Sequence, residues 1–400
     1  MNRVPEAVVN NARTNLIAAV SHALHRHLLW FLLAAYVVAA VWPGPGLWLK
    51  DVTFGEVVLF GQRTPVTLPM LLLALMLLNA GLGAHISRPR ELLQTSRFVA
   101  AGLAANFLVP LALIVVVAQL LSGWSEPDET QALLVGLAIV AAMPVAGSST
   151  AWSQNYNGNL TLSLGLVLVS TLLSPMSTPL SLHAVSWMLG EDSTNELSRL
   201  AAIGSSGFLI IFVALPSALG ICVRGGVGGR RVDRIKPYLK LSNSLTLLAL
   251  NYINGAISLP EVVRYPDWDF LAVTVGITVG FCVTTFCCGW WLSRLLGGDR
   301  SSRTALMFGL GMSNNGSGLV LAATALAGHP QVMLPILFYN LVQHLVAGSA
   351  AYLINDGRAR PEAREMDSPA RVTGIKGQRS RPELKPHNSY LGSAGPSAPD

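Results

Sequence analysis

Charged side chains are scarce in this sequence, and their scarcity excludes an ordinary soluble domain. Only 12% of the 400 residues are Asp, Glu, Lys or Arg, whereas hydrophobic residues make up 52%. About a quarter of the residues in a soluble domain are charged, because its surface must face water. The surplus of apolar side chains must therefore face another solvent, and the hydrocarbon of a lipid bilayer suits them.

Cysteine is also scarce, and the patterns that build an enzyme or a metal site are missing. The four cysteines lie in or beside apolar segments and form no C-x-x-C pair, so we interpret them as small core residues. No Ser–His–Asp set, no H-E-x-x-H motif and no pair of carboxylates occurs in the apolar segments. We therefore expect a protein that is not an enzyme and has no cofactor or bound metal, with Na+ left open as a transported ion.

Long apolar runs, by contrast, are abundant, and ten of them are candidates to cross a membrane as helices. About 20 mostly apolar residues span the hydrocarbon core. The first run is the shortest and is broken at Pro43 and Pro45, so nine spans are the alternative. The predicted spans are residues 28–42, 66–84, 98–122, 131–154, 160–187, 200–222, 241–259, 270–295, 304–327 and 331–354.

The basic residues test this number, because cytoplasmic loops of membrane proteins carry an excess of Lys and Arg. With ten spans and a cytoplasmic N-terminus, all but four of the 27 basic residues fall on the cytoplasmic side. The exceptions are Lys50, Arg63, Arg199 and Arg264. We predict an integral protein of a bacterial inner or plasma membrane, with both termini cytoplasmic and no removable signal peptide. The net charge of +6 then reflects topology, so the expected partners are the bilayer and a small solute rather than nucleic acid.

The ten spans make two halves of five, and a basic, glycine-rich stretch, R-G-G-V-G-G-R-R at residues 224–231, follows the sixth span. It lacks the G-K-[ST] of a phosphate-binding loop, so we interpret it as a flexible connector. Because five is an odd number, the second half must enter the membrane from the opposite side to the first. Two halves of this kind are typical of an inverted-topology repeat. The predicted parts are an N-terminal segment (1–27), a first half (28–222), a connector (223–240), a second half (241–355) and a disordered tail (356–400).

The fourth span of each half is interrupted in the same style. The first interruption follows Pro144, which removes a backbone donor, and the second is the glycine-rich G-L-G-M-S-N-N-G-S-G that begins at Gly309. Small residues of this kind also serve simply for close packing of membrane helices. Two clusters at matching positions favour a binding site, because paired half-helices present N-terminal ends to an anion and free carbonyls to a cation.

At these residues the chain resembles the bile acid:sodium symporter family. The similarity is strongest over residues 136–179 and 303–349 and extends over about residues 65–354. The family's P-G-G-T-A-S-N corresponds to residues 144–150, and its E-V-G-M-Q-N to residues 309–314. The resemblance implies an all-α membrane protein of about ten helices, with panel and core domains and crossing fourth and ninth helices. It also implies sodium-dependent transport of an organic anion, such as a bile acid, a keto acid or a pantoate-like acid.

The resemblance assigns site residues, several of which are substituted here. The family's glutamate, shared by both sodium sites, is Gly309 in this chain, and one family threonine is Val167. A carboxylate is the strongest single replacement for the hydration of an ion, so we hypothesise weakened or lost sodium coupling. The candidate cation-binding residues are Asn106, Ser149, Thr150, Ser163, Gly309, Met312 and Ser313, and the candidate substrate contacts are Ser148, Asn314, Asn315 and His344.

The function that we predict is secondary active or facilitative transport by alternating access. The alternative is a transport-incompetent membrane ligand sensor of the same fold, against which the tail without a folded domain argues. Three asparagines of the seventh span, Asn243, Asn251 and Asn254, share roughly one helix face, and bonds between helices are favoured there over cavity lining. The sequence leaves the substrate, the coupling ion, the direction of transport and the oligomeric state open.

Overall fold

The computed structural model of the protein describes residue 24 and residues 27–59, 62–84, 95–189, 207–326 and 328–366, with side chains of the last helix up to residue 350. The chain divides into two units, Met1–Asn355 and Asp356–Asp400, and the first holds the site discussed below. Three expected features lie outside the described residues: most of the N-terminal segment, the basic loop at Arg88 and Arg90, and the tail from residue 367.

Helix forms most of the described part of each predicted span, and the two interrupted spans are each a pair of shorter helices. The first half contains α2 (Leu28–Val41), α3 (Gly44–Asp51), β1 (Thr53–Leu59), β2 (Gln62–Thr67), α4 (Leu68–Gly83), α6 (Ser96–Leu120), α7 (Pro127–Ala142), α8 (Ser148–Asn155) and α9 (Leu160–Leu189). The second contains the π-helix η2 (Ile210–Ala214), α11 (Leu215–Val227), α12 (Gly229–Arg264), α13 (Trp268–Leu295), α14 (Arg300–Gly311), α15 (Asn315–Ala325), the 3₁₀ turn η3 (Pro330–Val332) and α16 (Met333–Met366).

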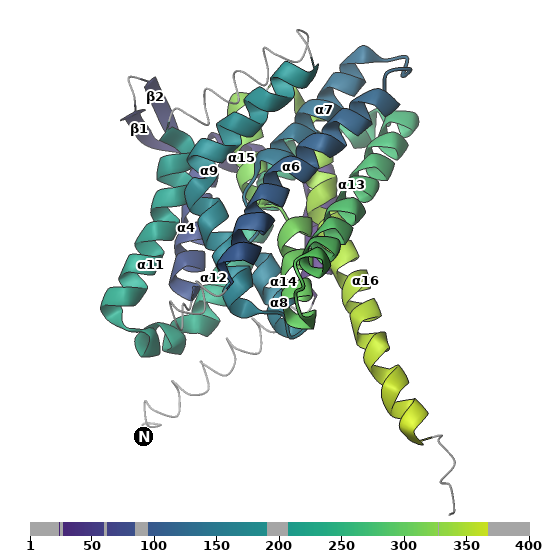
Figure 1. The fold of residues 1–400 in the computed structure, drawn as a ribbon. Helices are drawn as coiled ribbons and strands as arrows, with labels where there is room; N and C mark the ends of the chain where they lie inside the picture. The colour runs from purple at the N-terminus through teal and green to yellow at the C-terminus, as the bar shows by residue number, and fades with distance from the viewer. Residues whose placement is uncertain are drawn as a thin grey trace, which may run out of the picture. The chain divides into compact units, whose positions relative to one another are not determined.

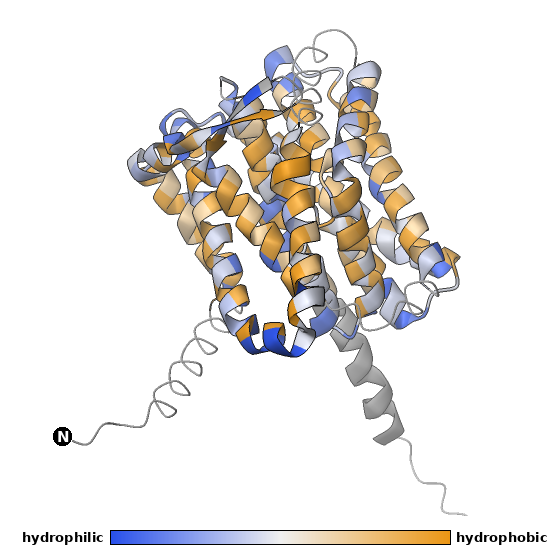
Figure 2. Ribbon diagram, turned by 90° about the vertical axis from the view of Figure 1, so that its left-hand side faces the viewer, coloured by the Kyte–Doolittle hydropathy of each residue, from blue (hydrophilic) through white to orange (hydrophobic). Residues whose placement is uncertain are grey.

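The helices of the first unit form a bundle in which segments far apart in the sequence are neighbours, such as α2 with α12 and α4 with α11 (Figure 1). Hydrophobic residues run along the middle of the helices, and hydrophilic residues gather toward the loops at the two ends (Figure 2). Large apolar side chains lie on the outside, where Leu120 is 73% and Trp187 is 87% exposed. In water such a surface would be costly, whereas in a bilayer it is the surface that lipid requires.

Among the described residues, five helices are long and apolar enough to cross a membrane alone. They are Ser96–Leu120, Leu160–Met188, Ile210–Val227, Trp268–Leu295 and Pro330–Ala350. The pair α2 and α3 adds a sixth if it is one span, although a bend of 94° separates its helices at the expected proline break. Each half of a broken helix is shorter than a membrane span, so it does not count as a spanning helix by itself. The total of ten spans therefore stays a prediction.

Two parts of the chain differ from what the sequence led us to expect. Residues 53–67, which we assigned no structure, form an antiparallel hairpin in which Thr53 pairs with Thr67 and Leu59 with Gln62. A search for apolar runs of membrane length overlooks it, because its strands have only seven and six residues. At the other end of the first unit, α16 continues to Met366, beyond the expected end of the last span at residue 354.

The basic glycine-rich stretch is not a flexible connector, and that interpretation was wrong. It is helical except at Gly228, whose φ of 90° turns the chain between α11 and α12. The Arg224 side chain is buried and donates to the carbonyl of Leu82 at 2.8 Å while pairing with Asp233 at 3.2 Å. Because one side chain joins α4, α11 and α12, this turn is held in place.

Candidate functional site

The interruptions of the α7–α8 pair and the α14–α15 pair lie against each other. The amide of Ala146 donates to the carbonyl of Met312 at 2.8 Å, and the amide of Asn314 donates to the carbonyl of Pro144 at 2.9 Å. Val145 stands opposite Ser313 between these two bonds, as in an antiparallel bridge. We call residues 143–147 and 312–314 together the crossing. The two broken helices predicted from the sequence are therefore both present and are joined where they unwind.

The bridge turns the amides of Val145 and Ser313 away from each other, and a side chain accepts each of them. The amide of Val145 donates to Ser170 Oγ at 3.1 Å, and that of Ser313 donates to Gln343 Oε1 at 3.1 Å. Ser170 lies on α9 and Gln343 on α16, the helices that follow the two broken pairs. These partners satisfy backbone groups that an unbroken helix would have satisfied itself.

The carbonyls at the ends of the first half-helices are satisfied in the same way. Tyr339 Oη donates to the carbonyl of Gly311 at 3.1 Å and lies 3.2 Å from Thr285 Oγ1. Thr178 Oγ1 donates to the carbonyl of Ala142 at 2.7 Å. The last carbonyls of α7 and α14 would otherwise lack partners. The crossing is thus a supported structure.

Several polar side chains at the start of the second half-helices are buried without a partner among the described residues. Ser149 and Ser153 on α8 have unpaired hydroxyls, as does Ser317 on α15. Asn315, which is only 1% exposed, has neither carboxamide atom bonded. A buried polar group left unsatisfied costs about 1–3 kcal/mol. These atoms are therefore where a polar ligand would gain most.

A comparison with known families indicates what kind of protein this is. Residues 70–263, from within α4 to the end of α12, match the model of the Sodium Bile acid symporter family. Over these residues the chain is similar to this family. The match contains the first broken pair, α7 and α8, and ends before the second. The similarity and the apolar helices together support an integral membrane protein related to a family of transporters.

The individual proteins to which the chain is similar are distant from it in sequence. The uncharacterized protein YbaS of Bacillus subtilis (strain 168) is 28% identical over 229 residues, which cover 57% of this chain and 71% of YbaS. The P3 protein of Mus musculus is 27% identical over 157 residues, 38% of this chain and 31% of its own. The P3 protein of Homo sapiens is 25% identical over 162 residues, 39% of this chain and 32% of its own. The chain therefore spans about a third of each P3 protein.

The cation-binding residues suggested by the family lie on several elements that meet near the crossing. Ser163 Oγ on α9 donates to Thr150 Oγ1 on α8 at 3.2 Å. Thr150 follows Ser149, whose hydroxyl is unpaired. Asn106 instead lines a small cavity of about 80 Å³ against Pro144 and the α7 end. Met312 and Ser313 take part in the crossing through their backbone bonds, given above.

Gly309, which occupies the place of the family's glutamate, is buried, and an apolar side chain lies directly against it. A Cβ added there would lie 2.8 Å from Cδ1 of Leu166 on α9. Leu166 belongs to a buried apolar cluster with Val167 and Leu310, among others. A bare cation beside this cluster would lack oxygen ligands on that side.

The expected substrate contacts have different surroundings. Asn314 Oδ1 accepts the amide of Ser317 at 3.4 Å, so its side chain caps α15. Asn315 keeps both polar atoms unpaired, Ser148 is half-buried at the start of α8, and His344 is buried on α16 next to Gln343. Gln343, Ser170 and Tyr339 were missed by the sequence analysis. The only signal for Gln343 was its place beside His344 in a long apolar run.

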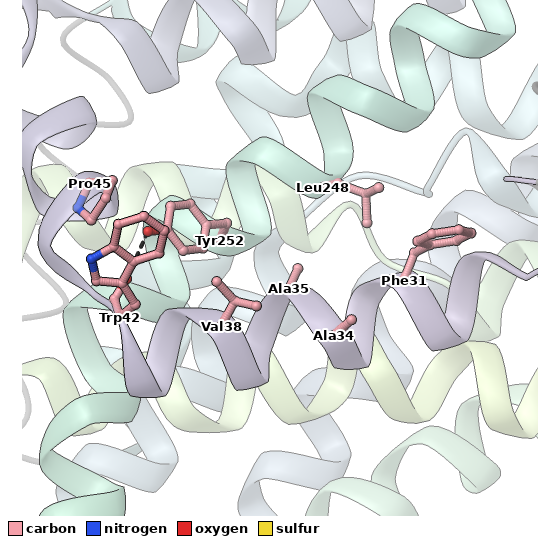
Figure 3. A pocket seen from close by; sticks show the side chains of 8 residues that line it. All are labelled: Phe31, Ala34, Ala35, Val38, Trp42, Pro45, Leu248 and Tyr252. Carbon is pink, nitrogen blue, oxygen red and sulfur yellow. Dashed lines mark hydrogen bonds between the residues drawn. The ribbon is translucent and has the colours of Figure 1, made fainter.

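A larger cavity than the one at Asn106 lies elsewhere and has the wrong chemistry. A groove of about 450 Å³ lies between α2 and α12 (Figure 3). It is lined by Phe31, Ala34, Ala35, Val38, Trp42, Pro45, Leu248 and Tyr252. The Tyr252 hydroxyl donates to the carbonyl of Trp42 at 2.8 Å. This groove offers no charge to an anion, so the crossing is the better candidate site.

Proposed function

We propose that this chain is a secondary transporter of a small or amphipathic organic anion, and that the crossing is its binding site. One observation carries the proposal: two unwound segments are bonded to each other, and uncharged polar groups beside them are buried without partners. The N-terminal ends of α8 and α15 adjoin this place, and helix N-termini favour an anion. Similarity to the sodium bile acid symporter family supports the choice of an organic anion.

We further propose that sodium coupling is weak or absent. The hydroxyls of Ser149, Thr150 and Ser163 form a neutral set beside the crossing. Gly309, where the family has a carboxylate, lies against the side chain of Leu166. A neutral oxygen cage compensates a cation's lost hydration less well than a carboxylate does. Facilitated transport, or transport driven in another way, fits this site better than two tightly bound sodium ions.

Alternating access between two oppositely oriented halves, the first five and the last five of the ten predicted spans, completes the proposal. The parallel roles of Ser170 and Gln343, each on the helix after a broken pair, support such a repeat. The distribution of basic residues supports a cytoplasmic location of both termini. In this arrangement the bound solute stays near the middle of the membrane while the halves move around it.

The test is a binding screen followed by a flux measurement on the full chain. Thermal unfolding in detergent is followed with bile acids, keto acids and pantoate-like acids, each as sodium and as potassium salts. We expect at least one anion to stabilise the protein, with little difference between the two cations. That anion should then enter proteoliposomes with saturable kinetics.

Asn315→Ala should remove most of this uptake, whereas Ser349→Ala should retain it. The Ser349 hydroxyl only bonds the Leu345 carbonyl of its own helix. Binding without flux in the unmodified protein would favour a ligand sensor, and an absence of binding by every anion would contradict the proposed site. Steep sodium-driven uptake by the unmodified protein would disprove weak coupling.

A further inference from the structure

A continuous chain of side-chain hydrogen bonds leads from the crossing to α2 and α12. It begins where Gln343 Oε1 accepts the amide of Ser313 at 3.1 Å, and Gln343 Nε2 donates to Asn340 Oδ1 at 3.2 Å. Asn340 Nδ2 donates to Asn251 Oδ1 at 2.7 Å and to Tyr36 Oη at 3.1 Å. Tyr36 Oη donates to Asn251 Oδ1 at 2.7 Å. Four side chains thus connect the unwound segment of α14–α15 with α16, α12 and α2.

Three of the four side chains in this hydrogen-bond chain are shielded from water, and the fourth, Tyr36, is half-buried. Asn251 is 1%, Gln343 2% and Asn340 3% exposed. Bonds in such surroundings are strengthened by the low local dielectric, and a broken one is not replaced by solvent. A change at one end of the chain therefore alters the free energy of the bonds further along it.

The direction of every bond is fixed by its first donor. The amide of Ser313 can only donate, so Gln343 must present its oxygen there and its nitrogen to Asn340. Asn340 must then accept with its oxygen and donate with its nitrogen to Asn251 and Tyr36. Asn251 Nδ2 completes the pattern by donating to the carbonyl of Leu247 at 2.7 Å. If one carboxamide of this hydrogen-bond chain rotated by half a turn, its oxygen would face another acceptor and its nitrogen another donor.

We propose that this chain of hydrogen bonds couples the arrangement of the crossing to the junction of α2 and α12. An acceptor that takes the amide of Ser313 must displace Gln343 Oε1, and the displaced side chain weakens its bond to Asn340. By reciprocity, weakening the junction at Tyr36 makes the amide of Ser313 easier to free. Tyr36, Asn251 and Asn340 are then positioning residues, which act on the site through Gln343. The coupling itself needs no ligand, and only the identification of the acceptor with an organic anion rests on the proposed function.

Hydrogen–deuterium exchange of the ligand-free full chain in detergent tests the coupling. Tyr36→Phe keeps the ring and removes the hydroxyl, and we expect it to speed exchange of the amides at residues 311–317 about five-fold. That factor corresponds to the net loss of one hydrogen bond. The matched control is Tyr252→Phe, which removes a tyrosine hydroxyl bonded at 2.8 Å between the same two helices but outside the chain. The control should leave residues 311–317 unchanged.

The reverse direction gives a second, independent measurement. Gln343→Leu should speed exchange around residues 247–256 of α12, whereas Ser170→Ala, at the other half of the crossing, should not. Thermal unfolding of each variant shows that it is folded. Equal effects of the two tyrosine variants at the crossing, or changes confined to the mutated helix, would overturn the proposal. Because no transport is measured, failure of the coupling and failure of the proposed transport function give different results.

Discussion

The two halves of the crossing have the same backbone geometry but different supports. In the first half, Ser170 accepts the amide of Val145 and donates to the carbonyl of Val167 at 3.1 Å, on its own helix, so the support ends there. In the second half, Gln343 continues into a chain that reaches α2 and α12. A short hydroxyl can only close a local gap, whereas a carboxamide accepts at one end and donates at the other. Two similar interruptions can therefore differ in what they transmit.

Their ligand chemistry differs as well. Beside the first interruption, Ser149, Thr150 and Ser163 place three hydroxyls close together. Beside the second, Gly309 lies against Leu166 in an apolar cluster. Three neighbouring hydroxyls thus line the first interruption, whereas the second combines unpaired polar groups on α15 with an apolar contact at Gly309. Four pairs of substitutions test this contrast.

The largest difference is expected for glycine to alanine substitutions in the two halves. A methyl group at Gly311 would overlap the ring of Phe286, whereas at Gly147 it meets nothing within 4 Å. We expect Gly311→Ala to destabilise the protein by about 1–3 kcal/mol or more through overpacking. Gly147→Ala, at a helical φ of −59°, should stabilise it by about 0.4–1 kcal/mol. Thermal unfolding in detergent measures both, and equal losses would show that the first interruption is as tightly enclosed as the second.

The amide acceptors should rank next. Gln343→Leu leaves the amide of Ser313 unpaired and disconnects the chain, so we expect a loss near the upper end of about 1–3 kcal/mol. Ser170→Ala leaves the amide of Val145 unpaired but disconnects nothing further, and its loss should lie near the lower end of that range. Denaturation curves compare them. If Ser170→Ala were the costlier, the continuing chain would add nothing to stability.

Restoring the family's carboxylate should create sodium dependence. Gly309→Glu combined with Leu166→Ala, which makes room for the new side chain, should raise the ratio of uptake in sodium to uptake in potassium about tenfold. This ratio corresponds to about 1.4 kcal/mol of differential binding. Gly309→Gln with Leu166→Ala has the same shape without the charge and serves as the control. A rise in both double variants would mean that space, not charge, limits the site.

The smallest difference concerns the N-terminal caps of the first half-helices. Asp299 accepts the amide of Ser302 at 2.9 Å at the start of α14, whereas Glu126 makes no such bond at the start of α7. Bonds from Ser302 and Ser301 lower the pKa of Asp299 from 3.8 to about 2. The carboxylate therefore stabilises the fold above pH 3.8, and this contribution disappears as the pH falls through about 2.

Asp299→Ala should accordingly cost about 0.5–2 kcal/mol at neutral pH, and less in acid. Glu126→Ala should change stability little at either pH. Thermal unfolding between pH 2 and pH 7 separates the two variants. A pH-independent loss for Asp299→Ala would mean that its charge plays no part.

Much of the candidate site was predictable from local chemistry. Pro144 and the glycines from Gly309 onward weaken a helix, and polar residues follow both, so the two interruptions were predicted from the sequence. Ser149 and Asn315 were candidates for the same reason, since polar side chains beside unwound backbone at membrane depth need a ligand or a partner. The hairpin at residues 53–67 and the helical course of residues 224–231 were not predictable, because they depend on neighbours that fix short strands and a buried Arg224.

The sequence by itself determined that this chain is a helical membrane protein with two interrupted helices, because apolar length and proline and glycine chemistry act within a few neighbouring residues. Only the tertiary structure decided that the interruptions bond to each other, that Leu166 fills the space at Gly309, and that Gln343 connects the crossing to Tyr36. Those outcomes join residues 143 to 307 positions apart, and no local preference specifies which distant side chain will satisfy a buried amide.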